Sequence, residues 1–199
     1  MTDIVPLVPN QTVPPLRVDL AGGRQFDLTS EKPFHFTLVV FYRGLHCPIC
    51  KTQLKELESK LDDFETRGVA VVAVSTDSKE RAEQTRETWG LSRLRIGYGL
   101  PLATARHWGL YVSSGHGKTS AGVDEPALFS EPAIYLVRPD GTLYFGSVQT
   151  MPFSRPHFSD ILTAIDFVVK NKYPARGEVA DLRKSAEGLA APTYCPDRQ

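Results

Sequence analysis

The sequence is poor in cysteine, has no net excess of charge and has no long apolar run, and each absence excludes a class of protein. Three cysteines in 199 residues are too few for a disulfide scaffold, which indicates a reducing, cytoplasmic location. Lys and Arg total 23 and so do Asp and Glu, which argues against nucleic acid as a partner, because phosphate binding needs a basic excess. No stretch approaches the roughly 18 apolar residues of a membrane span, so we expect no membrane partner.

The remaining composition is typical of one globular domain. Apolar residues make up 41% of the chain and charged residues 23%, and a chain of this length buries about 70% of its unfolded surface. It therefore needs no metal or disulfide for stability, and we expect no cofactor. Residues 1–16 are proline-rich and predict an extended arm without the pattern of a secretory signal peptide. The domain is predicted to span 17–170, and a polar tail follows over 171–199.

Hydrophobic patterning predicts an α/β fold with a mixed central sheet flanked by helices. Residues 36–42 and 69–75 are continuous apolar, β-branched runs, as expected for strands buried on both faces. Between them, apolar residues recur at helical spacing over 48–67, and this β-α-β order implies parallel strands with a right-handed crossover. The other predicted elements are an N-terminal hairpin (16–28), a helix capped by Asp77 and Glu80, a strand (95–100), a short helix (102–109), a loop (113–130), two hairpin strands (133–137 and 143–148) and a helix from Phe158.

The motif that carries chemistry is Cys47-Pro48-Ile49-Cys50, between the first long strand and the first helix. With Cys47 as the N-terminal cap, Pro48 occupies the first helical position, where its missing N–H costs nothing, and Cys50 faces back towards Cys47. The unpaired N–H groups and the positive end of the helix dipole favour a thiolate there. The spacing also lets the two sulfurs close a disulfide ring, as thiol–disulfide exchange requires.

Two other interpretations of this pair remain open. A zinc site would need four nitrogen or sulfur ligands, and only Cys47, Cys50, His46 and the distant Cys195 are available. An inert, buried pair of cysteines is the other alternative, although a helix start after a buried parallel strand is an unusual place for it. The β-α-β context favours redox chemistry over both.

Residues 41–50 (FYRGLHCPIC) resemble the active-site segment of the peroxiredoxins, the alkyl hydroperoxide reductase/thiol-specific antioxidant family, which has a thioredoxin-like fold. The family pattern is FYP, then Thr or Ser, two further residues and the peroxidatic cysteine. The resemblance places that cysteine at Cys50, the hydroxyl-bearing residue at Cys47 and the proline at Arg43. It extends over roughly residues 15–170 and implies that Arg155 is an active-site arginine.

The sequence departs from the family pattern at two of these positions. Arg43 replaces the proline that shields the site, and Cys47 replaces the hydroxyl that would bond the thiolate and the peroxide. The result resembles the peroxiredoxin-like branch that carries CxxC in place of TxxC. A second thioredoxin-like feature is Pro132, directly before the strand 133–137, and its position leads us to expect a cis peptide bond.

Three further residues are candidates for supporting roles. Arg43 and His46 flank the CxxC, and a positive charge on either would favour the thiolate. For His46, a loop histidine without a catalytic role is an equal alternative. The resolving cysteine of two-cysteine peroxiredoxins is absent after residues 177–179 (GEV), so Cys195 is either a substitute resolving cysteine or an unused exposed thiol.

These residues predict a thiol-based oxidoreductase with two alternative modes. In the favoured mode Cys47, expected to be the more exposed thiol, attacks a substrate disulfide and Cys50 resolves the mixed disulfide. In the alternative mode Cys50 attacks a peroxide, forms a sulfenic acid and condenses with Cys47. Both modes need a thiol reductant as a partner. A non-enzymatic redox sensor or binding module is a further alternative, and the tail and the segment 113–130 are candidate elements of a homodimer interface.

Overall fold

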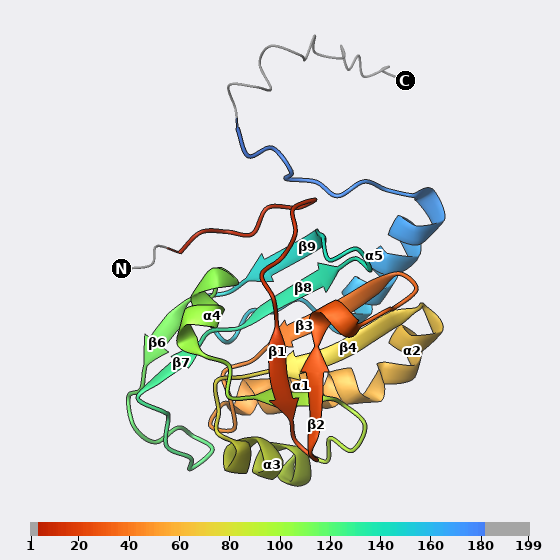
Figure 1. Cartoon of the computed structure of the whole chain (residues 1–199). Helices are drawn as coiled ribbons and strands as arrows, with labels where there is room; N and C mark the ends of the chain where they lie inside the picture. The colour runs from red at the N-terminus through yellow and green to blue at the C-terminus, as the bar shows by residue number, and fades with distance from the viewer. Residues whose placement is uncertain (1–3, 182–199) are drawn as a thin grey trace, which may run out of the picture.

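A seven-stranded mixed β-sheet forms the centre of the structure, a computed structural model that describes residues 4–181 (Figure 1). Its strands lie in the order β2-β1-β5-β4-β3-β8-β9. They are β1 (Arg17–Leu20), β2 (Arg24–Asp27), β3 (Phe36–Phe41), β4 (Val69–Val74), β5 (Ile96–Tyr98), β8 (Ala133–Val137) and β9 (Leu143–Val148). A separate ribbon consists of β6 (Val112–Ser114) and β7 (Leu128–Ser130). The helices are α1 (Pro48–Ser59), α2 (Leu61–Thr66), α3 (Lys79–Thr88), α4 (Leu102–His107) and α5 (Phe158–Asn171).

The pairing of the central strands confirms the predicted α/β fold. β3 pairs with β4 in parallel, from Phe36 opposite Val69 to Phe41 opposite Val74, and β4 continues in parallel with β5. The hairpin of β1 and β2 and the hairpin of β8 and β9 extend the sheet in antiparallel pairing on its two sides. The predicted long helix ends at Lys60, where α1 stops and α2 begins.

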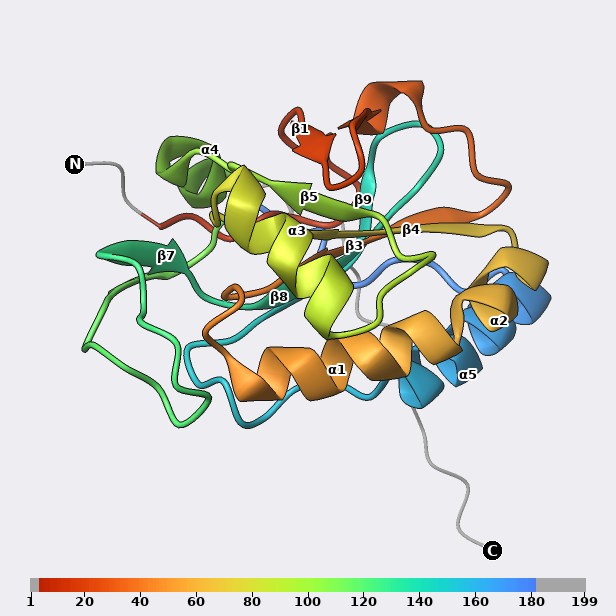
Figure 2. The same ribbon diagram turned by 90° about the horizontal axis from the view of Figure 1, so that it is seen from below.

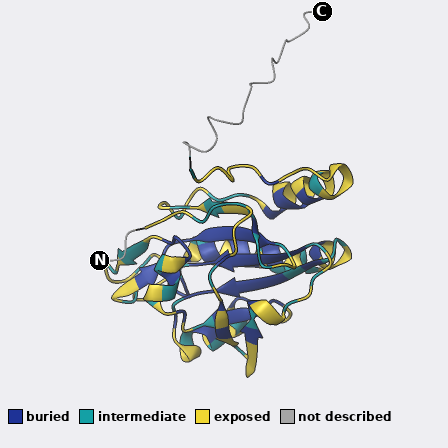
Figure 3. Ribbon diagram, turned by 45° about the horizontal axis from the view of Figure 1, so that its top comes forward, coloured by how far each residue is buried: buried dark blue, intermediate teal, exposed yellow. Residues whose placement is uncertain are grey.

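Helices cover the two faces of the sheet unequally, and Figure 2 shows α1, α2 and α5 on one side and α4 on the other. In the core under α1, α2, α3 and α5, Leu54 and Leu57 of α1 and Phe158 of α5 join strand residues such as Val40. On the opposite face Trp108, directly after α4, packs into a second core. The central strands are buried between these layers (Figure 3), which explains their unbroken apolar sequences.

The segment 113–130 contains a strand pair and is therefore not the continuous loop that we predicted. Val112–Ser114 and Leu128–Ser130 pair as antiparallel strands. The connection between them folds over the segment before α1, where the Thr119 hydroxyl donates to the His46 carbonyl at 2.7 Å. Strands of three residues are too short to give an alternating pattern in a glycine-rich stretch, so the sequence carries no signal for them.

The cap of α3 is Ser78, which corrects the predicted cap at Asp77. The Ser78 hydroxyl accepts the N–H of Arg81, the bond expected of an N-terminal cap. The buried Asp77 carboxylate instead accepts the N–H of Leu45 at 2.7 Å and the Nε–H of Arg81 at 2.8 Å. Asp77 therefore fixes the segment before α1 to the start of α3.

Within 4–181, no helix combines the length and the apolar character that crossing a bilayer requires.

Candidate active site

Cys47 and Cys50 lie where the chain passes from β3 into α1. Cys47 is the N-terminal cap, and its Sγ accepts the N–H of Cys50 at 3.3 Å. Pro48 occupies the first helical position, and the Cys47 N–H donates to the Gly44 carbonyl at 3.1 Å. This is the local geometry that the CxxC spacing predicts, with both side chains in the first turn of the helix.

Both cysteines are buried, and Cys47, which we expected to be the more exposed thiol, is only marginally more exposed than Cys50. The exposed fraction is 1% for Cys47 and 0% for Cys50. Pro48 is exposed at the outer side of the turn, whereas the sulfurs contact Arg155 in the segment between β9 and α5. That segment screens the thiols from bulk water, which the spacing of the motif alone could not reveal.

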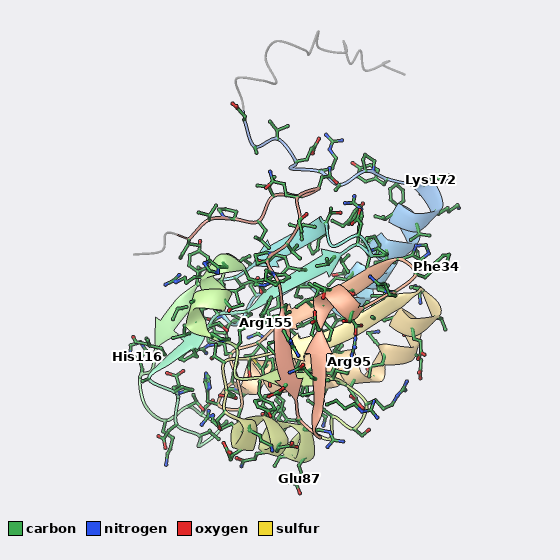
Figure 4. All side chains as sticks on the ribbon, viewed as in Figure 1. Phe34, Glu87, Arg95, His116, Arg155 and Lys172 are labelled. Carbon is green, nitrogen blue, oxygen red and sulfur yellow. The ribbon has the colours of Figure 1, made fainter. Side chains whose placement is uncertain are left out.

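Arg155 brings a fixed positive charge to both sulfurs. Its Nη2 lies 3.3 Å from Cys50 Sγ and 3.7 Å from Cys47 Sγ, and its Nη1 lies 3.4 Å from Cys50 Sγ. Its Nε donates to the Pro152 carbonyl at 2.9 Å, and Nη1 also donates to Oε1 of Gln53. Arg155, labelled in Figure 4, is half-buried. A guanidinium held at this many points stabilises negative charge on the sulfurs without having to rearrange.

The surroundings shift the pKa values of the two thiols in opposite directions. The hydrogen bond from the Cys50 side chain lowers the pKa of Cys47 to about 6, against the effect of burial and with help from the Cys50 N–H and Arg155. Burial, and then the neighbouring Cys47, raise the pKa of Cys50 well above its usual value. The pair thus holds one proton and one negative charge near neutral pH, and the proton belongs to the pair rather than to one sulfur.

We expect the alkylation of the reduced protein by iodoacetamide to show a midpoint near pH 6. The thiolate is the nucleophile, so the rate is high above the pKa of Cys47 and falls as the pH drops through about 6. Brief labelling on either side of this pH, followed by peptide mass spectrometry, measures the midpoint and locates the label on Cys47. A midpoint near 9.0, the ordinary value for a cysteine, would contradict the expectation.

Arg43 lies beside the cysteine pair and is held by two acids. Its Nη2 is 3.2 Å from Glu125 Oε1, and its Nε is 3.4 Å from Glu131 Oε2. The guanidinium also lies over the ring of Phe129, 4.5 Å from the ring centroid. Its charge contributes to lowering the pKa of Cys47, although it contributes less than Arg155 does. Arg43 therefore ties the connection between β6 and β7 to the loop before the cysteines.

His46 is buried and uncharged. Burial, and then the charge of Arg43, lower its pKa to about 4, so the ring is neutral at neutral pH. Its Nδ1 lies 3.4 Å from Arg81 Nη2, and its ring packs against Phe129 with centroids 4.6 Å apart. A positive His46 beside the thiols does not fit this environment, and the alternative of a loop histidine without a charge role fits it better.

Two other candidate residues stand apart from this constellation. The peptide bond before Pro132 is trans, which corrects the expected cis bond. The chain stays extended there, with Glu131 N–H bonded to the Tyr111 carbonyl and Gln149 N–H to the Pro132 carbonyl, and the trans form is favoured by about 0.5–1 kcal/mol. Cys195 lies outside the described residues. In the described part of the chain, no three His, Cys, Asp or Glu residues are grouped so that they could hold a metal ion.

Gln53 contacts Arg155 and was not among the residues predicted from the sequence. Its side chain is only 7% exposed and its Oε1 accepts a hydrogen bond from Arg155. In the sequence it is one polar residue in a polar run, for which the surface of a helix is the ordinary place. The one available signal was its spacing of three residues from Cys50, which puts both on neighbouring positions of the helix surface.

Comparison with known proteins places this site in a family. Residues 9–145 match the sequence profile of the AhpC/TSA family, a range that includes both cysteines and ends before Arg155. A candidate peroxiredoxin of Mycobacterium tuberculosis (strain H37Rv) is 30% identical over 125 residues, which is 62% of this chain and 78% of that protein.

Solved structures agree on the fold. The reduced 2-Cys peroxiredoxin of Plasmodium vivax aligns with a TM-score of 0.68 at 17% identity, and the alignment covers 84% of each chain. The peroxidoxin BcpB of Mycobacterium tuberculosis aligns with a TM-score of 0.64 at 13% identity, covering 81% of this chain and 98% of that one. At these identities the two structures establish that the thioredoxin-like fold of peroxiredoxins is shared.

Proposed function

The chain belongs to the AhpC/TSA family and is a thiol-dependent oxidoreductase, and on this premise we propose that it is a peroxidase in which Cys50 attacks a peroxide. The observation that carries the proposal is the Arg155 guanidinium, which has two nitrogen atoms within 3.4 Å of Cys50 Sγ. A peroxide that loses its O–O bond at this sulfur develops negative charge on the departing oxygen. A fixed cation in a screened site is the group that best stabilises such a charge.

The proposed reaction needs only the two sulfurs and one external reductant. Cys50 thiolate forms when its proton passes to Cys47, and the thiolate then attacks one peroxide oxygen. The S–O bond forms as the O–O bond breaks, and the departing oxygen takes the proton held by Cys47 and leaves as water from hydrogen peroxide or as an alcohol from an organic peroxide. Cys47 thiolate next attacks the sulfenic acid on Cys50, and hydroxide leaves as water once protonated by solvent. Two equivalents of a thiol reductant, supplied by a reducing cytoplasm, return the disulfide to the dithiol.

A disulfide reductase remains the second candidate, because one observation favours it. The pKa of Cys47 is lowered to about 6, and a thiolate at the cap of α1 is suited to attack a substrate disulfide. This was the mode favoured by the sequence alone. Membership of the AhpC/TSA family and the likeness to proteins named as peroxiredoxins support the peroxidase instead.

Two serine variants separate the candidates, because each mode leaves its intermediate on a different sulfur. In the peroxidase, Cys47→Ser accumulates a sulfenic acid on Cys50 after one equivalent of peroxide, and a sulfenic-acid probe such as dimedone labels it. Cys50→Ser loses rapid peroxide consumption. In the reductase, Cys50→Ser instead accumulates a mixed disulfide on Cys47 with a disulfide substrate.

For the unmodified protein, we expect one equivalent of hydrogen peroxide to link Cys47 to Cys50, as peptide mapping will show. Peroxide consumption on the order of 10⁴ M⁻¹s⁻¹ or faster in kcat/KM would support the peroxidase. Slow peroxide consumption together with turnover of a disulfide would overturn it. Stoichiometric oxidation without turnover of either substrate would favour the sensor.

A further inference from the structure

Gln53, three residues after Cys50 in α1, has a buried side-chain donor without a partner among the described residues. Its Oε1 accepts a hydrogen bond from Arg155 Nη1, and a guanidinium offers donors only, so the orientation of the amide is fixed. The Nε2 atom must then point away from Arg155. It is buried and has no hydrogen-bond partner among residues 4–181. The side chain as a whole is 93% buried, because only 7% of it is exposed.

A buried donor without an acceptor lowers the stability of the folded state, and the contacts of Gln53 connect this donor to the active site. Leaving such a group unpaired costs about 1–3 kcal/mol, so native structures keep it for a reason. The Arg155 Nη1 that bonds Gln53 also lies 3.4 Å from Cys50 Sγ. One nitrogen atom therefore connects the amide of Gln53 to the sulfur that the proposed peroxidase uses.

We propose that Gln53 is a catalytic residue whose Nε2 donates a hydrogen bond to an oxygen of the peroxide bound at Cys50. The proposal rests on the peroxidase function. Cys47 occupies the position at which the family pattern has a hydroxyl, and a thiol is a much weaker hydrogen-bond donor than a hydroxyl or an amide. The carboxamide would replace the missing donor from the next turn of α1, acting alongside Arg155.

The amide also gives the site a preference for peroxides over disulfides. Peroxide oxygens are good acceptors, and the departing oxygen becomes a stronger one as the O–O bond breaks, so the bond from Nε2 strengthens towards the transition state. Disulfide sulfurs are weak acceptors and gain little from the same donor. Loss of Nε2 is therefore expected to slow the reaction of Cys50 with peroxide more than the alkylation of Cys47 by iodoacetamide.

A ratio of two rates tests the proposal, because Gln53 also holds Arg155 and a variant could act through that contact alone. The reaction with hydrogen peroxide and the alkylation by iodoacetamide are each measured per thiolate, at a pH above the alkylation midpoint. Gln53→Glu keeps an acceptor for Arg155 and removes the amide donor, and Gln53→Met removes both without adding charge. We expect each variant to lower the ratio of peroxide rate to alkylation rate by about 10²-fold, the usual effect of one transition-state donor.

The outcomes are distinguishable. If Gln53 only positions Arg155, Gln53→Glu, which keeps the acceptor, leaves the ratio unchanged, and Gln53→Met lowers the ratio only together with a rise in the alkylation midpoint; either result overturns the proposal. If the unmodified protein reacts with peroxide no faster than a simple thiol does, the peroxidase function fails, and the proposal fails with it. Gln84→Glu makes the same chemical change at an exposed position of α3 and is the matched control, with no change in the ratio expected. Thermal unfolding identifies a variant that does not fold, and the other variant then decides.

Discussion

Replacing Arg155 with methionine will slow the reaction with peroxide by about 10²- to 10³-fold and shift the alkylation midpoint to higher pH. The variant loses the three contacts of the guanidinium with the sulfurs and the fixed charge that helps to hold the pKa of Cys47 near 6. Both effects make the protein less reactive near neutral pH. The thiolate is less stabilised and so forms only at higher pH, and the departing oxygen of the peroxide loses the cation that stabilises its charge. Stopped-flow kinetics with hydrogen peroxide and a pH profile of alkylation measure the two separately.

Arg155→Lys is the informative control for this substitution. Lysine keeps the charge and loses the planar fork that reaches Cys47, Cys50 and Gln53 together. We expect an alkylation midpoint close to that of the unmodified protein, because the charge alone sets the pKa of the thiol. The rate of reaction with peroxide should still fall by about 10-fold or more, because that rate depends on the geometry of the guanidinium. An unchanged alkylation midpoint in Arg155→Met would show that the guanidinium does not act on the thiolate.

The second large effect is expected from Gly44→Ala, which should lower the free energy of unfolding by about 2–5 kcal/mol. Gly44 has φ +134°, and a Cβ there would lie 2.5–2.7 Å from three atoms of the Asp77 carboxylate. That carboxylate cannot move aside, because it is buried and bonded to Leu45 N–H and Arg81. Since Gly44 also accepts the N–H of Cys47, the displaced loop should carry the thiols with it.

Urea unfolding measures the loss of stability, and the alkylation midpoint reports the displacement of Cys47. Gly90→Ala is the matched control, since Gly90 also has a positive φ (+69°) but has nothing within 4 Å of a Cβ. It should cost only the backbone penalty of about 1–2 kcal/mol and leave the thiols unchanged. Equal costs for the two variants would mean that the contact with Asp77 is not what excludes a side chain at Gly44.

The parts of this structure that follow from sequence are those that local spacing encodes. The apolar runs of β3 and β4, the turn after Val137 and the CxxC each specify their conformation within a few residues, and the structure has all of them. Hydrophobic periodicity works here because the central strands are buried on both faces, so their whole length is apolar.

The features that could not be predicted from the sequence depend on contacts between segments that are distant in the chain. The sequence position of Asp77 is typical of a helix cap, but its carboxylate accepts the N–H of Leu45 from another segment. The pKa of His46 is lowered because its ring is buried, with Phe129 packed against it, and the sequence does not show this burial. Gln53 becomes part of the site only because residues between β9 and α5 bring Arg155 onto α1. The trans bond at Pro132 likewise follows from the path between β7 and β8.

The charge held at the cap of α1 also sets how readily the disulfide accepts electrons. Contacts that stabilise the thiolate exist only in the dithiol, so they favour reduction of the Cys47–Cys50 disulfide. A pKa lowered from 9.0 to about 6 stabilises the dithiol at pH 7 by about 1.4 kcal/mol, which raises the two-electron reduction potential by about 30 mV. This advantage disappears as the pH falls through about 6. The same contacts that prepare the thiol for attack therefore also widen the range of reductants that can regenerate it.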